Sequence, residues 1–202
     1  MKERPILFSA SMVRALLAGT KTQTRRIAKP VRHPDLGNMY APGALVLEHE
    51  PQHVIDRCCP YGRPGDRLWV RETHMNWWKL DPANPEGPRL FSHVAAFAAD
   101  GYELEPGERW IPSIHMLRAA SRILLEITGV RVERLQSINE ADAAAEGVAT
   151  WAPGALSPES LGADPSDQFR WLWTSINGPG SWGANPWVWV VEFKVIKPEG
   201  AP

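Results

Sequence analysis

The sequence has only two cysteines and no long apolar run. Cys58 and Cys59 are adjacent, so they provide no disulfide framework and indicate a reducing compartment. No segment approaches the ~18 consecutive apolar residues that a membrane-spanning helix requires. The apolar stretch that follows Met1–Arg4 is too short for a signal peptide. We therefore expect a soluble, cytoplasmic protein.

The common motifs of nucleotide, metal and serine-hydrolase chemistry are also missing. The chain has no Walker loop, no Rossmann glycine fingerprint, no HExxH and no G-x-S-x-G. His49, His53, Cys58 and Cys59 lie close together, but their spacing fits no standard zinc pattern, and adjacent cysteines rarely bind one tetrahedral ion together. We expect no metal and no cofactor.

Proline, tryptophan and a local excess of positive charge are what the sequence does have. Its 202 residues include 19 Pro and 10 Trp, which indicates long ordered loops and large flat side chains rather than a helical bundle. The formal net charge is -1, yet residues 1–35 carry eight Lys and Arg against two acidic side chains. Such a patch suits a phosphate, a nucleotide or a short RNA better than long duplex DNA, and solvated surface charge is the alternative.

Local patterns predict short strands, few helices and two long insertions in a single domain over residues 1–202. Strands are expected over 5–8, 67–73, 123–135 with a bend at Thr128–Gly129, and 187–196. Helices are expected before Gly19, from a capping box at Ser137–Glu140 through Ala145, and after Asp164–Pro165. The insertions are 30–64, with one strand at 44–47, and 77–112. The pattern favours an α+β fold with a small barrel or a strongly bent sheet.

The stretch Gly19–Arg26 carries the residues of greatest chemical interest. Gly19 ends a helix and allows a sharp turn, after which Lys21 and Thr24 can face one cavity. A hydroxyl becomes a good nucleophile when a neutral lysine takes its proton, and burial beside arginines lowers a lysine pKa. Lys-Thr-Arg clusters also bind phosphate, so this motif alone leaves catalysis and phosphate binding open.

Four blocks of the sequence, in this order, resemble the ASCH domain of the PUA-like superfamily. They are Gly19-x-Lys21-x-x-Thr24-x-Arg26, Gly65-Asp66-x-Leu68, the segment from Ile127-Thr128-Gly129 to Ala145-Glu146-Gly147, and Trp187–Phe193. Together the blocks cover about half of the chain. The long, Trp-rich form of the domain, which includes residues 110–116, resembles a subgroup of the family found in bacteria and their phages.

The resemblance implies a PUA-like small β-barrel with flanking helices and a cleft for a modified nucleobase or RNA. The best-defined enzymes of this family are amidohydrolases that remove the acyl group from N4-acetylcytidine with a lysine, a threonine and a glutamate. In this chain the matching residues are Lys21, Thr24 and Glu146. We therefore expect an N4-acylcytidine amidohydrolase, which cleaves a linear amide in a nucleoside. The alternative is an RNA-binding or RNA-cleaving module in which the stretch Lys21–Arg26 contacts phosphates.

In the expected mechanism, neutral Lys21 takes the proton of Thr24, whose oxygen attacks the acyl carbonyl. Glu146 helps to relay a proton to the departing amine, and Arg26 is a candidate to stabilise the oxyanion. The sequence leaves open whether Thr24 forms an ester or only orients a water. It also leaves open the acyl group, the choice between free nucleoside and RNA, and the oligomeric state.

Recognition of the base requires an aromatic face and a reader of the base edge. Trp69 and Trp110 are candidates to stack on the base, and Trp77 and Trp78 are further possibilities. Glu72 and His115 are candidates to read the edge of the base. Most of the tryptophans nevertheless fit a core role.

Overall fold

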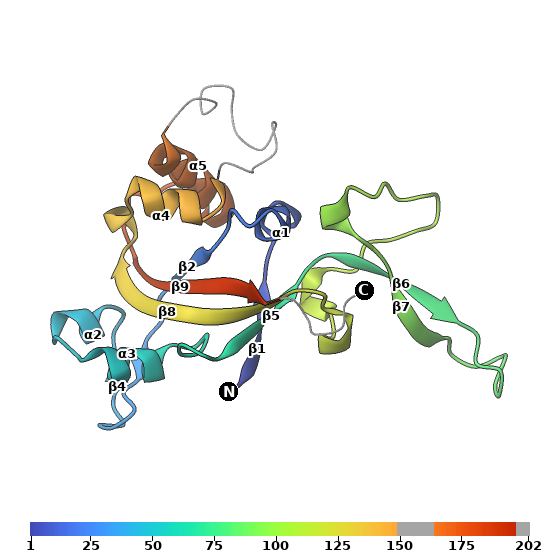
Figure 1. Cartoon of the computed structure of the whole chain (residues 1–202), viewed down its shortest axis with the longest axis horizontal. Helices are drawn as coiled ribbons and strands as arrows, with labels where there is room; N and C mark the ends of the chain where they lie inside the picture. The colour runs from blue at the N-terminus through green and yellow to red at the C-terminus, as the bar shows by residue number, and fades with distance from the viewer. Residues whose placement is uncertain (149–163, 197–202) are drawn as a thin grey trace.

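The computed structural model describes residues 1–148 and 164–196 as an α+β fold built on a five-stranded sheet (Figure 1). The sheet has the strand order β1-β5-β8-β9-β2. Its strands are β1 (Glu3–Leu7), β2 (Gln23–Ile27), β5 (Arg67–Arg71), β8 (Leu124–Arg134) and β9 (Trp187–Ile196). β1 and β5 are parallel, and the other neighbouring pairs are antiparallel. The predicted α+β class is confirmed, and closure of the sheet into a barrel stays a prediction.

Short helices and two small hairpins surround the sheet. The helices are α1 (Ala10–Leu17), α2 (Ala44–Leu47), α3 (Gln52–Cys58), α4 (Glu140–Ala145) and α5 (Pro165–Asn177). The hairpins are β3 (Val31–Arg32) with β4 (Met39–Tyr40), and β6 (His74–Lys79) with β7 (Leu90–Phe97). Single 3₁₀ turns lie at Ala98–Asp100, Ser113–His115, Arg118–Ala120 and Leu135–Ser137. In the part of the chain that is described, none of the helices has the length and apolar character to cross a bilayer.

Strand β9 is buried on both faces and connects two hydrophobic cores. Trp189 and Val191 lie in the core that also contains residues of α1, α3, β5 and β8, whereas Val188 and Val190 pack against α4 and α5. Because both faces are covered, the strand begins as a continuous apolar run instead of alternating with polar residues. Each large apolar side chain buried in this way contributes about 1.5–3 kcal/mol to folding.

Helix α1 ends at Gly19, as the sequence predicts. The amide of Gly19 donates to Leu16 O at 3.1 Å, and that of Thr20 donates to Ala15 O at 3.0 Å. Gly19 has φ +74°, the left-handed conformation that glycine adopts without strain at a helix end. This backbone cap turns the chain from α1 toward β2 and places Lys21 directly after the turn.

The prediction of a strand at residues 44–47 is wrong, because this segment forms helix α2. The helix begins after Gly43, which has φ +87°. A Cβ atom at Gly43 would lie 2.1 Å from the indole of Trp187, so the close approach of these two residues fixes the turn from which α2 starts. This tertiary contact outweighs the β-like pattern of Ala44–Leu47.

Helix α4 is present where it was predicted, but Ser137 does not cap it. The N-cap is Asn139, whose Oδ1 accepts a hydrogen bond from the amide of Asp142 at 2.8 Å. Ser137 belongs to the preceding 3₁₀ turn. The later helix start predicted at Asp164 is confirmed, since the Asp164 side chain accepts from the amides of Ser166 and Asp167.

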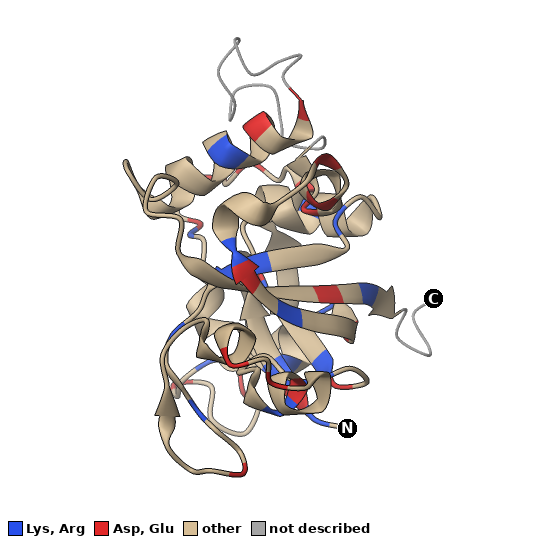
Figure 2. Cartoon of the chain, turned by 90° about the vertical axis from the view of Figure 1, so that its left-hand side faces the viewer, with Lys and Arg blue, Asp and Glu red and all other residues tan. Residues whose placement is uncertain are grey.

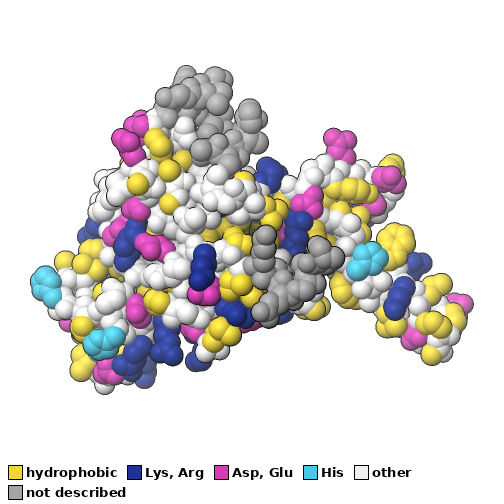
Figure 3. Space-filling view, in the orientation of Figure 1, with side chains coloured by type: hydrophobic (Ala, Val, Ile, Leu, Met, Phe, Trp, Pro, Cys, Tyr) yellow, Lys and Arg dark blue, Asp and Glu magenta, His cyan; other side chains and the backbone are white. Residues whose placement is uncertain are grey.

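The segment 77–112 contains a structured hairpin that the sequence did not predict. β6 and β7 pair outside the five-stranded sheet and project from it (Figures 1 and 3). The pairing shifts register twice, between Met75 and Asn76 and between Trp77 and Trp78. These irregularities interrupt the alternation of polar and apolar residues by which a strand is predicted.

Basic and acidic residues are interspersed along the ribbon of the fold (Figure 2). Arg4 forms an ion pair with Asp66 at 3.1 Å, and Lys21 and Arg25 are buried and paired with carboxylates. Several of the basic residues in the N-terminal stretch therefore neutralise acidic groups of the same chain instead of forming one open cationic surface.

Candidate active site

Lys21 and Glu146 meet because the end of α1 packs against the end of α4. Glu146 is the C-cap of α4, and Gly147 follows it with φ +81°. The amide of Thr22 donates to Ala145 O at 2.8 Å, and Lys21 and Glu146 form an isolated antiparallel bridge. This backbone contact brings together two residues that are 125 positions apart in the chain.

Lys21 and Glu146 form a buried ion pair. Lys21 Nζ donates to Glu146 Oε2 at 2.8 Å and to the backbone oxygen of Glu146 at 2.9 Å. The two residues are 1% and 3% exposed, and the ring centre of Phe8 lies 5.6 Å from Nζ. Burial lowers the pKa of Lys21, the Glu146 carboxylate opposes this shift, and Arg26 and Arg25 add to the lowering. The Lys21 ammonium therefore loses its proton more readily than that of an exposed lysine.

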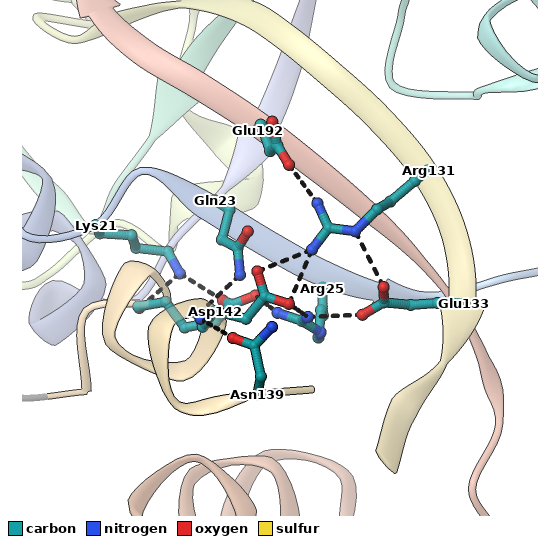
Figure 4. A network of polar contacts seen from close by, with 9 residues as sticks. Lys21, Gln23, Arg25, Arg131, Glu133, Asn139, Asp142 and Glu192 are labelled. Carbon is teal, nitrogen blue, oxygen red and sulfur yellow. Dashed lines mark hydrogen bonds and ion pairs between the residues drawn. The ribbon is translucent and has the colours of Figure 1, made fainter. Parts of the chain in front are cut away.

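The second oxygen of Glu146 contacts Arg25. Arg25 belongs to a network of ion pairs with Asp142, Glu133 and Arg131 (Figure 4). Arg25, whose side chain is fully buried, donates to Glu146 Oε1 at 3.3 Å, to Asp142 Oδ2 at 2.9 Å and to Glu133 Oε1 at 2.6 Å. Arg131 contacts Asp142 and Glu133 from the other side. Burial raises the pKa of Asp142, but Arg25 and Arg131 outweigh it and leave this pKa below its usual value. The network fixes the orientation of the Glu146 carboxylate.

Thr24 and Glu146 line one narrow pocket of about 90 Å³. Thr24 is 2% exposed, and no other described residue forms a hydrogen bond with its hydroxyl. Arg26 also lines the pocket: its Nη2 donates to Leu7 O at 2.6 Å, while its buried Nε has no partner within the described ranges. The pocket thus combines a hydroxyl without a hydrogen bond, a fixed carboxylate and an unused N–H donor.

Apolar residues of α5 form the rest of this pocket. Phe169, Leu172 and Trp173 line it, and all three are also part of the second hydrophobic core. Their i, i+3 and i+4 spacing on a helix indicates a core position, and no pattern in the sequence indicates that they also line a pocket. Arg131 and Glu133 were missed as well, although their i, i+2 spacing on a strand places two opposite charges on one face.

Two residues predicted to contact the base take part in other interactions. The guanidinium of Arg71 lies 5.4 Å from the ring centre of Trp69 on β5. Glu72 is 1% exposed and accepts two hydrogen bonds from Arg122, each at 3.0 Å. Burial raises the pKa of Glu72, although Arg122 opposes this shift. Neither Trp69 nor Glu72 lines the Thr24 pocket.

The other two predicted base contacts, Trp110 and His115, are also outside the Thr24 pocket. Trp110 packs edge-on against Tyr102, with ring centres 6.3 Å apart. His115 is exposed at the end of a 3₁₀ turn. The structure therefore joins Lys21 to Glu146 and places Glu146, Thr24 and Arg26 on one pocket. None of the predicted base contacts lines that pocket, and the same holds for Trp77 and Trp78.

Gly147→Ala tests how closely the ends of α1 and α4 must approach. A Cβ at this position would lie 2.8 Å from Ala15 Cβ and 2.9 Å from Lys21 Cβ. We expect the substitution to lower the free energy of unfolding by more than the ~1–2 kcal/mol that left-handed strain alone costs. Gly65→Ala is the matched control, because Gly65 has φ +86° and no atom within 4 Å of an added Cβ. Equal losses in urea unfolding would show that the close approach is unimportant.

His49, His53, Cys58 and Cys59 are close in the sequence but are not gathered into a cluster of ligands in the described structure. Cys58 and Cys59 are buried free thiols, and burial raises the pKa of Cys59 to about 11. Among the residues that the structure describes, no group of three or more His, Cys, Asp or Glu is arranged to hold a metal ion.

Comparisons of the chain with protein-family models, curated proteins and solved structures found no match.

Proposed function

We propose that this protein is an amidohydrolase that removes a small acyl group from N4 of an N4-acylated cytosine nucleoside. The observation that carries this proposal is the buried Lys21–Glu146 pair, with Nζ 2.8 Å from Oε2, beside a pocket that contains the Thr24 hydroxyl. A buried ion pair is costly to form, and groups with shifted pKa values cluster at functional sites. The sequence blocks that resemble the ASCH domain supply the substrate class.

The proposed reaction is acyl transfer followed by hydrolysis. The proton of the Thr24 hydroxyl passes to neutral Lys21, and a bond forms between Thr24 Oγ1 and the acyl carbon. The bond from the acyl carbon to N4 then breaks, and the amine leaves with a proton relayed through Lys21 and Glu146. Water cleaves the resulting ester, which releases the carboxylic acid and restores Thr24. The proposed donor to the oxyanion is the Arg26 Nε–H, which has no partner among the described residues.

The size of the pocket supports a small acyl group. Its volume of about 90 Å³ is well below the ~300–1,000 Å³ of sites that enclose a whole drug-sized ligand. A group the size of acetyl fits this space, with the apolar side chains of Phe169 and Leu172 beside it. On this proposal the ribose lies outside the pocket.

The alternative, in which the stretch Lys21–Arg26 binds RNA phosphates, has less support. Lys21 and Arg25 are 1% and 4% exposed, and both are already paired with carboxylates. A phosphate could reach them only by displacing these partners.

The amidohydrolase proposal is tested directly by following the conversion of N4-acetylcytidine to cytidine by ultraviolet absorbance.

The pH dependence of this reaction tests the role of Lys21. Because the neutral amine is the base, kcat/KM is expected to rise with pH and level off above the Lys21 pKa, which burial places below its ordinary value of 10.5. Arg26→Met removes a positive charge that lowers this pKa. In that variant the rising part of the plot of kcat/KM against pH should therefore move to higher pH, independently of any change in the maximal rate. A rising part that stays in place would contradict the assignment of Lys21 as the titrating base.

A further inference from the structure

The hairpin β6–β7 has a pocket of its own, lined by four consecutive residues of β6. In a regular strand, successive side chains point to opposite faces. Met75, Asn76, Trp77 and Trp78 nevertheless line the same pocket, of about 440 Å³. The strand pairing shifts register between Met75 and Asn76 and again between Trp77 and Trp78. Because a bulge changes the direction of the side chains that follow it, these shifts explain how neighbouring residues can line one pocket. The two indoles, 58% and 43% exposed, thus reach one site.

Three polar groups of this hairpin pocket, on Arg89, Arg109 and Asn76, have no partners among the described residues. Arg89 and Arg109 line it, and neither forms an ion pair or hydrogen bond with another described residue. Asn76 Oδ1 is buried and has no hydrogen-bond partner among those residues. Glu108, the carboxylate of the lining, already accepts a hydrogen bond from the Tyr102 hydroxyl at 2.9 Å. The pocket therefore offers two aromatic side chains, two cationic donors and one buried acceptor.

We propose that the hairpin pocket binds a nucleotide of single-stranded RNA. A base stacks on Trp77 or Trp78, its amino group donates to Asn76 Oδ1, and the adjoining phosphates accept from Arg89 and Arg109. Aromatic faces combined with guanidinium groups are the usual means of holding a single strand without reading its sequence. The choice of RNA rests on the proposed function, in which the substrate is a cytidine derivative. The apolar and basic side chains of the projecting hairpin are visible in Figure 3.

Fluorescence anisotropy with a labelled single-stranded RNA of about eight nucleotides tests this site. Trp77→Ala with Trp78→Ala is expected to weaken binding by about 10-fold or more, because the base loses both surfaces on which it can stack. Trp77→Phe keeps a stacking face and should retain most of the affinity. Trp171→Ala, which removes a 48% exposed tryptophan from α5, is the matched control and should leave the Kd unchanged.

The two arginines are tested by the salt dependence of the same binding. Arg89→Met with Arg109→Met should lower the slope of log Kd against log salt by about 1.4, since each phosphate contact on a single strand contributes about 0.7. Arg170→Met on α5 is the control for loss of one exposed arginine. RNA binding that is undetectable, or that neither double variant weakens, would overturn the proposal.

Hydrolysis of free N4-acetylcytidine by the same variants separates this proposal from the proposed function. The hairpin residues do not line the Thr24 pocket, so both double variants are expected to keep the wild-type kcat/KM. A protein that binds RNA through the hairpin but hydrolyses no acylated cytidine retains the RNA site and refutes the amidohydrolase. A protein that hydrolyses the nucleoside but binds no RNA refutes the RNA site alone.

Discussion

Lys21→Met, Thr24→Val and Glu146→Gln are each expected to lower kcat/KM for N4-acetylcytidine by at least about 100-fold, the lower end of the effect of a positioned acid or base. Lys21→Met removes the amine that accepts the proton. Thr24→Val removes the hydroxyl and keeps the shape of the side chain. Glu146→Gln removes the negative charge that pairs with Lys21 Nζ at 2.8 Å. The measurement is the ultraviolet assay of cytidine release, with folding checked by circular dichroism.

Two substitutions of the same residue types serve as controls. Glu140 lies on α4, Lys29 follows β2, and both side chains are exposed. Neither Glu140→Gln nor Lys29→Met should therefore alter kcat/KM. Turnover that survives Thr24→Val would exclude a Thr24 ester and favour direct attack by water. Turnover that survives Lys21→Met, or a wild-type protein inactive on acetyl and larger acyl groups, would refute the proposed function.

Arg25→Met is expected to lower the free energy of unfolding by about 3–5 kcal/mol, the usual cost of removing one partner from a buried ion pair. Arg25 contacts Glu133, Asp142 and Glu146 at once. Its loss leaves three carboxylates with only Arg131 and Lys21 to balance them. Arg25 is one of the two cations that hold the pKa of Asp142 below its usual value, so this pKa rises when Arg25 is removed. The deficit should therefore be largest near neutral pH and shrink as the pH falls.

Urea unfolding of Arg57→Met provides the comparison for this loss. Arg57 pairs with Asp35 at 2.8 Å, but the two side chains are 43% and 52% exposed. Exposed pairs contribute about 0–1 kcal/mol, so this variant should be nearly as stable as the wild type. If Arg25→Met were equally mild, the network around Glu146 would not be a source of stability.

Those parts of the fold that depend on local signals could be predicted from the sequence. Three such signals each determine structure within a few residues of their own position. They are the continuous apolar run of β9, the glycine that ends α1 and the Asp164–Pro165 start of α5. The helix at residues 44–47 could not be predicted, because it depends on the packing of Gly43 against Trp187, far along the chain. The bulged hairpin was missed for the related reason that its strands lack a regular alternation.

The candidate site was predictable only in part. The resemblance to the ASCH domain named Lys21, Thr24 and Glu146, and the structure brings Lys21 to Glu146 and Thr24 into the adjoining pocket. The expected base contacts were chosen by residue type, which carries no information on where a side chain points. Glu72 shows the difficulty, since its partner Arg122 is 50 positions away and only the folded chain brings them together.

The long excursion between β5 and β8 leaves the sheet and returns to it at adjacent points, because Trp69 on β5 pairs with Leu124 on β8. The entropic cost of closing such a loop grows only slowly with its length, so the sheet places little constraint on what the excursion contains. Lys21, Thr24 and Glu146 all lie outside it. A change in the length of the hairpin within this excursion should therefore cost little in loop-closure entropy and leave the residues near the pocket in place.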